Sequence, residues 1–158
     1  MQFLYKTVKS VLDSGRIGSP VFVRCVAQIA SDREHLTDAL AEVLAIAGLW
    51  LSASPQKVYA QGGKDAGQIT ATVHYLSGQT ALVSVGTVKA NGMPRVDLML
   101  LGNKGAIYHD SLLLPSFAMP AGTISRIGIS ISKSLMDAVE RSLQTGKSAI
   151  IEGGKTNE

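Results

Sequence analysis

Hydrophobic residues recur at helical spacing in three parts of the chain. Residues 2–14 place Leu4, Val8, Val11 and Leu12 on one side, and Gly15 follows as a glycine that ends the helix. Residues 36–51 carry the second apolar stripe, and residues 135–143, closed by Gly146, carry the third. The pattern therefore predicts three helices. Beyond Glu42 the second helix is apolar all round, so we expect its C-terminal half to be enclosed.

Strict alternation of apolar and polar residues marks the rest of the chain as strands. The predicted strands cover residues 21–29, 57–62, 68–75, 79–88, 95–101 and 106–109, and a short strand follows the last helix. Short turns such as Ser77-Gly78 join consecutive strands, which favours antiparallel pairing. We therefore predict one α+β domain over residues 1–158, with an open, mostly antiparallel sheet and helices packed on one face.

The ends of two segments have their own signals. Ser31 and Glu34 form a capping box ahead of the second helix, and Ser52 to Pro55 end it. Pro115 and Pro120 indicate an irregular crossing before the last helix.

Composition excludes several classes of protein. Of the 158 residues 46% are hydrophobic and only 17% are charged, which excludes a disordered chain. The net charge of +3 comes from scattered basic residues without a cluster, so we expect no nucleic-acid partner. The longest apolar stretch, Val43–Leu51, is far shorter than the ~20 residues of a membrane span, so we expect no membrane contact.

The N-terminal residues and the single cysteine indicate where in the cell the protein is found. Lys6 and Lys9 interrupt the first eleven residues, so we expect no signal peptide. Cys25 is the one cysteine, which excludes an intrachain disulfide and fits a reducing compartment. We therefore predict a cytoplasmic protein.

Few residues suit metal or cofactor chemistry. His35, His74 and His109 lie in three separate predicted elements, so we expect no metal site. Cys25 sits in the apolar register of its strand, as an inert buried thiol does. No Gly-x-Gly-x-x-Gly occurs, so no dinucleotide-binding site is expected in this chain.

An acidic stripe is the most informative polar pattern. Glu34, Asp38 and Glu42 repeat every four residues and so line one face of the second helix. Asp38 and Glu42 stand where that helix becomes apolar, and carboxylates at such a rim can bind hydroxyl groups or act as acid and base. The alternative is a solvated stripe paired with Arg33 or a lysine.

Four segments together resemble a known family. They are Lys6–Val21, which ends in Ser-Gly-Arg-Ile-Gly-Ser-Pro-Val; Leu36–Ala60; Leu98–Tyr108, which reads LMLLGNKGAIY; and Val139–Ile151. Their order and spacing resemble the C-terminal domain of the Gfo/Idh/MocA oxidoreductases. The resemblance implies a sheet with helices on one face and subunit contacts on the other.

The resemblance also implies an activity. The family carries out NAD(P)-dependent oxidation or reduction of sugars, inositols and related polyols, with the cofactor held by an N-terminal Rossmann domain that this sequence lacks. Its aspartate falls on Asp38, whereas its catalytic histidine falls on Glu42. On this basis Asp38 and Glu42 are the catalytic candidates, and Arg33, His35, Asp38 and Glu42 the substrate-binding candidates.

Two functions follow from this resemblance. In the first, the chain is the substrate-binding and oligomerising half of such an enzyme, inactive without a separate Rossmann-domain partner that brings NAD(P). In the second, it is a non-catalytic structural or regulatory subunit derived from the family.

Both functions predict a homo-oligomer. The strands over residues 68–76 and 79–88 place mostly small polar side chains on the face away from the helices, and that face lacks charge. These residues are Thr70, Thr72, Thr80, Leu82, Ser84 and Val88. Such a face suits burial against another sheet, although threonine is also common on solvated strands.

Overall fold

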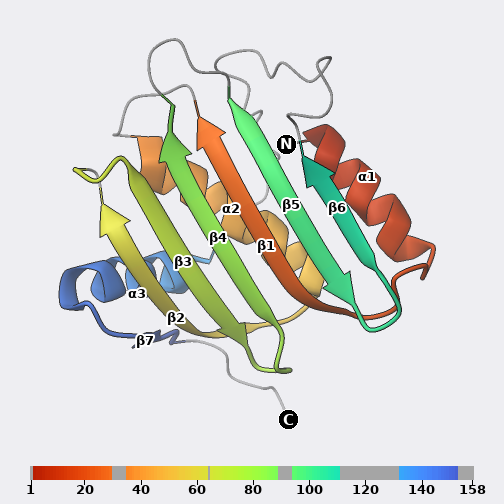
Figure 1. The fold of residues 1–158 in the computed structure, drawn as a ribbon. Helices are drawn as coiled ribbons and strands as arrows, with labels where there is room; N and C mark the ends of the chain where they lie inside the picture. Colours follow the sequence, from red (N-terminus) through yellow and green to blue (C-terminus); the bar gives the residue numbers. More distant parts are fainter. Residues whose placement is uncertain (1, 30–34, 64, 89–93, 111–131, 153–158) are drawn as a thin grey trace.

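A computed structural model describes residues 2–29, 35–63, 65–88, 94–110 and 132–152. These ranges form helices α1 (Gln2–Asp13), α2 (Leu36–Leu51) and α3 (Lys133–Thr145) and one seven-stranded sheet (Figure 1). The strands are β1 (Pro20–Ile29), β2 (Pro55–Gly63), β3 (Gln68–Tyr75), β4 (Thr80–Thr87), β5 (Arg95–Gly102), β6 (Ala106–Asp110) and β7 (Ala149–Ile150). No helix within these ranges is long and apolar enough to cross a membrane.

The sheet is open and mostly antiparallel, as predicted. Its strand order is β6-β5-β1-β4-β3-β2-β7. Every pair is antiparallel except β1 and β4. The parallel pair arises because α2 carries the chain behind the sheet, and the β2-β3-β4 meander then returns it to the side of β1.

Two helices cover one face of the sheet. In Figure 1, α2 and α3 lie behind the strands, and α1 stands beside β6. α2 packs on β1 and β4, and α3 packs on β2. The core lies between these layers, because alternate residues of each central strand are buried, as in the run Ile69, Ala71, Val73 and Tyr75 of β3. The α+β class with helices on one face is confirmed.

The second helix has the predicted bounds but is not wholly enclosed. Nine of its residues are buried, which are Leu36, Ala39, Leu40, Val43, Leu44, Ile46, Ala47, Trp50 and Leu51. Leu49, however, is 46% exposed, so the expectation of complete enclosure past Glu42 is wrong. Leu49 is turned away from the sheet because a helix buries only the stripe that meets its neighbours. Ser31, Glu34, Pro115 and Pro120 lie outside the described residues.

Two motifs that carry the family resemblance pack against each other. The turn between β5 and β6 meets the turn that precedes β1: the Ser19 backbone N–H donates to Asn103 Oδ1 at 3.0 Å, and the Lys104 N–H donates to the Ile17 carbonyl at 3.0 Å. A Cβ at Gly102 would lie 2.1 Å from the Ile17 carbonyl oxygen. Glycine is therefore required here by the close approach of two backbones.

The face of the sheet opposite α2 and α3 has no described element across it (Figure 1). On β3 and β4 the predicted residues do lie on this side, because their neighbours in sequence are the buried ones; they are Thr70, Thr72, Thr80, Leu82 and Ser84. Val88 comes directly after β4. We call this surface the open face. The expectation that it lacks charge is wrong, because the adjacent strands β1 and β5 place Arg24, Arg95 and Asp97 on the same side.

Candidate functional site

The N-terminal half of α2 gathers most of the predicted site residues. His35 is exposed and directly precedes the helix, Asp38 is exposed in its first turn, and Glu42 is half-buried one turn later. Steps of three and four residues place them on one face of the helix. The structure therefore brings His35, Asp38 and Glu42 together. Arg33, the fourth candidate, lies outside the described residues.

Glu42 is the chemically distinctive member of this group. Its Oε1 atom is out of contact with solvent and has no hydrogen-bond partner. Burial disfavours the charged form and so raises the pKa of this carboxyl above its ordinary value of 4.5. A carboxyl with a raised pKa can both give and accept a proton nearer neutral pH, which an exposed glutamate does poorly.

Asp38 complements Glu42. It lies in the first turn of α2, where the helix dipole stabilises a negative charge by about 0.3–1 kcal/mol. A solvent-accessible carboxylate accepts hydrogen bonds from hydroxyl groups on both of its oxygens. One helical turn therefore presents a hydrogen-bond acceptor beside a proton-transfer group, a pair of functions that suits a hydroxylated ligand.

The other end of α2 has two buried polar atoms that the sequence did not indicate. Trp50 Nε1 and Tyr75 Oη are both buried without a hydrogen-bond partner. A Cβ at Gly48 would lie 3.7 Å from Tyr75 Oη, so this hydroxyl rests against the helix. Burial raises the pKa of Tyr75 to about 12, so the phenol is neutral at physiological pH. Strand alternation predicts that Tyr75 is buried, but it does not show whether its hydroxyl has a partner.

The cysteine and the other two histidines take no part in a site with α2. Cys25 is fully buried, as predicted, and burial raises its pKa to about 12. His74 lies exposed on β3, and His109 lies on β6. No cluster of three or more His, Cys, Asp or Glu residues in the described ranges could hold a metal ion.

The segment ahead of α2 does not fit a nicotinamide dinucleotide. Such a site needs a glycine-rich turn from a strand into a helix, with phosphates at the helix N-terminus. The one strand that leads directly into α2 is β1, and residues 30–35 between them include no glycine. No chemical step through NAD(P) can be assigned to these residues.

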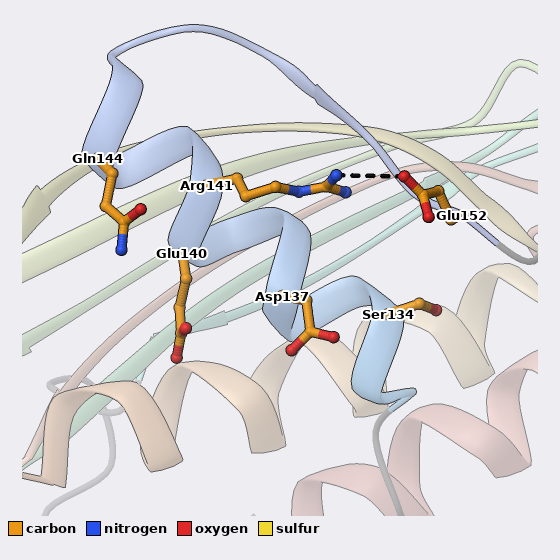
Figure 2. A pocket seen from close by; sticks show the side chains of 6 residues that line it. All are labelled: Ser134, Asp137, Glu140, Arg141, Gln144 and Glu152. Carbon is orange, nitrogen blue, oxygen red and sulfur yellow. Dashed lines mark hydrogen bonds and ion pairs between the residues drawn. The ribbon is translucent and has the colours of Figure 1, made fainter.

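A shallow polar hollow lies on α3, apart from the predicted residues. Figure 2 shows its six lining side chains, which are Ser134, Asp137, Glu140, Arg141, Gln144 and Glu152. Its volume is about 360 Å³. Arg141 Nη1 lies 3.3 Å from Glu152 Oε1, and Arg141 Nη2 donates to the Ile150 carbonyl at 2.9 Å. These contacts hold the segment after β7 against the outer side of α3. The hollow is therefore typical of a solvated helix surface.

Solved structures of dehydrogenases have a similar fold. A probable dehydrogenase from Thermotoga maritima matches at a TM-score of 0.69 and 15% identity, over 94% of this chain and 62% of its own. A myo-inositol dehydrogenase from Corynebacterium glutamicum matches at 0.68 and 14%, over 95% and 62%. A myo-inositol dehydrogenase from Lactobacillus casei, in complex with NAD(H) and myo-inositol, matches at 0.70 and 16%, over 96% and 60%.

The chain has the fold of a large part of these three dehydrogenases. It spans about three fifths of the length of each. No protein-family model matches the sequence, and no curated protein matches it. At 14–16% identity this likeness shows a shared fold, and that fold agrees with the one that the sequence resemblance implies.

Proposed function

We propose that this chain is the substrate-binding and subunit-contact half of an NAD(P)-dependent oxidoreductase for a sugar, inositol or related polyol. The observation that carries the proposal is the pair on α2: a half-buried Glu42 with an unpaired oxygen, one turn from the carboxylate of Asp38. The dehydrogenase-like fold supports it, since one neighbour was solved with myo-inositol.

In this proposal each side chain has one role. Asp38 accepts hydrogen bonds from ligand hydroxyls and orients the ring. Glu42 exchanges a proton with the reacting hydroxyl, because burial raises its pKa above the ordinary value of a glutamate. His35 lies on the same face and adds a further hydrogen-bonding group, and Arg33 is proposed as the fourth contact. The cofactor comes from a Rossmann domain outside this sequence, so the chain alone is inactive.

Calorimetric titration of the chain with myo-inositol and a panel of sugars tests the ligand class. We expect binding that weakens about tenfold or more in Asp38→Asn and Glu42→Gln, because each loses a hydrogen bond that a charged or polarised group makes. Asp137→Asn and Glu140→Gln, on the outer face of α3, serve as matched controls and leave the affinity unchanged. Absence of binding to every polyol would contradict the proposal.

Turnover assays test the need for a partner. The chain with NAD(P)⁺ and a polyol should produce no NAD(P)H, whereas a co-expressed Rossmann domain should restore turnover. Turnover by the chain alone would contradict the proposed division of labour.

The alternative is a non-catalytic structural or regulatory subunit. The glutamate at the position of the family histidine favours it, since a glutamate has an ordinary pKa of ~4.3 against ~6.5 for histidine. The same titration separates the two functions. A folded, self-associating chain that binds no polyol would support the alternative. The predicted cytoplasmic location stays a prediction under both.

We also propose that the open face forms a homo-oligomer. Partly exposed apolar side chains of three neighbouring strands lie on it; they are Phe22, Val26, Leu82, Met99 and Leu101. Covering such a patch with a second sheet removes apolar surface from water, which stabilises the association by about 25 cal/mol for each Å² buried. Sedimentation velocity at micromolar concentration should show a species larger than the monomer.

A further inference from the structure

Arg24 is an unpaired charge near the middle of the open face. It is exposed on β1, directly opposite Leu82 of β4 and Met99 of β5. Along β1 its neighbours on the same side are Phe22 and Val26. No hydrogen bond or ion pair holds its guanidinium within the described part of the chain. Covering this patch would therefore strand a cation among apolar side chains unless the covering surface brings an anion.

Asp97 supplies the opposite charge on the same face. It lies on β5 directly across from Val26, so it is the diagonal neighbour of Arg24. The two side chains nevertheless form no ion pair with each other in the described structure. Asp97 Oδ1 is buried and has no hydrogen-bond partner, which is rare in a folded protein. The open face thus carries Arg24 and Asp97, both without a partner in the described structure, at diagonal positions. Two other charged residues lie near Asp97: Arg95, whose Nε is likewise buried without a partner, and Asp110, directly across from Asp97 on β6.

We propose that the open face is self-complementary, with Arg24 of each copy paired to Asp97 of the other. This inference rests on the proposed self-association and names the contact that directs it. A face with both signs at neighbouring unpaired positions matches a second copy of itself. A twofold axis that passes through the interface between Arg24 and Asp97 places Arg24 of each copy opposite Asp97 of the other. The interface then contains the pair twice, surrounded by apolar side chains that exclude water.

Charge-reversal variants test this pairing. Arg24→Glu alone sets two carboxylates against each other at both contacts, and Asp97→Arg alone sets two guanidinium groups against each other at both. We expect each variant to bind itself at least about 100-fold more weakly than wild type. Two ion pairs are lost, and each contributes about a factor of ten to the affinity. In a heterodimer of the two variants, one contact joins the native pair and the other joins the same two charges with their positions exchanged. If like charges cause the loss in each homodimer, an equal mixture of the two variants should form the wild-type species. Each variant alone should not, and sedimentation velocity distinguishes the two results.

The double variant Arg24→Glu with Asp97→Arg in one chain gives the most direct rescue. Every contact between two such chains again joins a carboxylate to a guanidinium, with the positions exchanged at both contacts. We expect this double variant to associate within about tenfold of wild type, although each single change weakens association about 100-fold.

Arg95 provides a matched comparison on the same face. It lies two residues from Asp97 on β5. Its Nε also lacks a hydrogen-bond partner, but that atom is buried within the chain and is less free to reach a second copy than the exposed side chain of Arg24. The double variant Arg95→Glu with Asp97→Arg should therefore fail to restore the dimer. Glu140→Lys, on α3 behind the sheet, should leave association unchanged. Circular dichroism and thermal melting confirm that every variant is folded.

The outcomes separate this inference from the proposed function. A dimeric wild type whose Arg24→Glu and Asp97→Arg variants still dimerise would overturn the pairing and leave the open-face interface standing. Single variants that weaken association without rescue in the double variant would also overturn it. A folded wild type that stays monomeric would overturn the self-association itself, while polyol binding at α2 would be untouched.

Discussion

Glu42 shows how a single side chain links burial to chemistry. The backbone of α2 holds it at the edge of the core, where one carboxyl oxygen loses water without gaining a hydrogen bond. A native protein tolerates such an atom at a cost of about 1–3 kcal/mol. The same desolvation that costs stability raises the pKa of the carboxyl and suits it to proton transfer.

This link makes stability depend on pH in a defined direction. Because the pKa of Glu42 is higher in the folded chain than the ordinary 4.5, the folded state holds the proton more tightly. Its contribution to stability is therefore present at low pH and is lost as pH rises through the folded pKa. Glu42→Gln should raise the melting temperature by about 1–3 °C at pH 7 and leave it unchanged near pH 4. Glu140→Gln is the exposed control, and an equal gain at both pH values would contradict the assignment.

The hydroxyl of Ser142 has a structural role through its buried hydrogen bonds. Its buried hydroxyl accepts from the Ala60 backbone N–H at 2.8 Å and donates to the Lys147 carbonyl at 2.7 Å, which ties α3 to β2. Ser142→Ala leaves the Ala60 N–H buried without a partner, so the free energy of unfolding in urea should fall by about 1–3 kcal/mol. Exposed Ser148→Ala should change it by less than about 0.5 kcal/mol. Equal effects would mean that the Ser142 contacts add nothing.

Among the elements, the β5-β6 turn is the most tightly constrained. Gly102→Ala would push a methyl group onto the Ile17 carbonyl, only 2.1 Å away, and should destabilise the chain by about 1–3 kcal/mol. Gly105→Ala, in the same turn, meets its nearest atom at 3.5 Å and should have little effect. Urea denaturation of the two variants measures the difference. A Gly102→Ala variant as stable as Gly105→Ala would show that the two turns are not in contact.

The elements were largely predictable from sequence because burial is one-sided. Alternation in β3, such as Ile69 and Ala71 against Thr70, fixes both the strand and the face it buries. The parallel pairing of β1 with β4 was not predictable, since it depends on where α2 returns the chain. Charge on the open face was missed because Arg24 and Asp97 lie on strands far apart in sequence, and only the sheet order makes them neighbours.

The site was predictable only in part, for a related reason. Helical spacing places Asp38 and Glu42 on one face, but it does not distinguish a solvated carboxylate from one with a covered oxygen. The unpaired atoms of Trp50 and Tyr75 depend on the packing of α2 against the sheet, which sequence spacing does not encode.

At the scale of the whole molecule, the two proposed functions fall on opposite surfaces of the sheet. The covered side supports α2 and its acidic pair, while the open face presents apolar side chains around Arg24 and Asp97. The proposed ligand site and the proposed interface therefore lie on opposite sides of the sheet and would not obstruct each other.

Polyol binding at α2 can be observed residue by residue. In a ¹⁵N-resolved NMR titration with myo-inositol, the largest amide shifts should fall between His35 and Glu42 and should shrink about tenfold at equal ligand in Glu42→Gln. Saturating concentrations that move no amide of α2, or that move only those around the hollow on α3, would contradict the account.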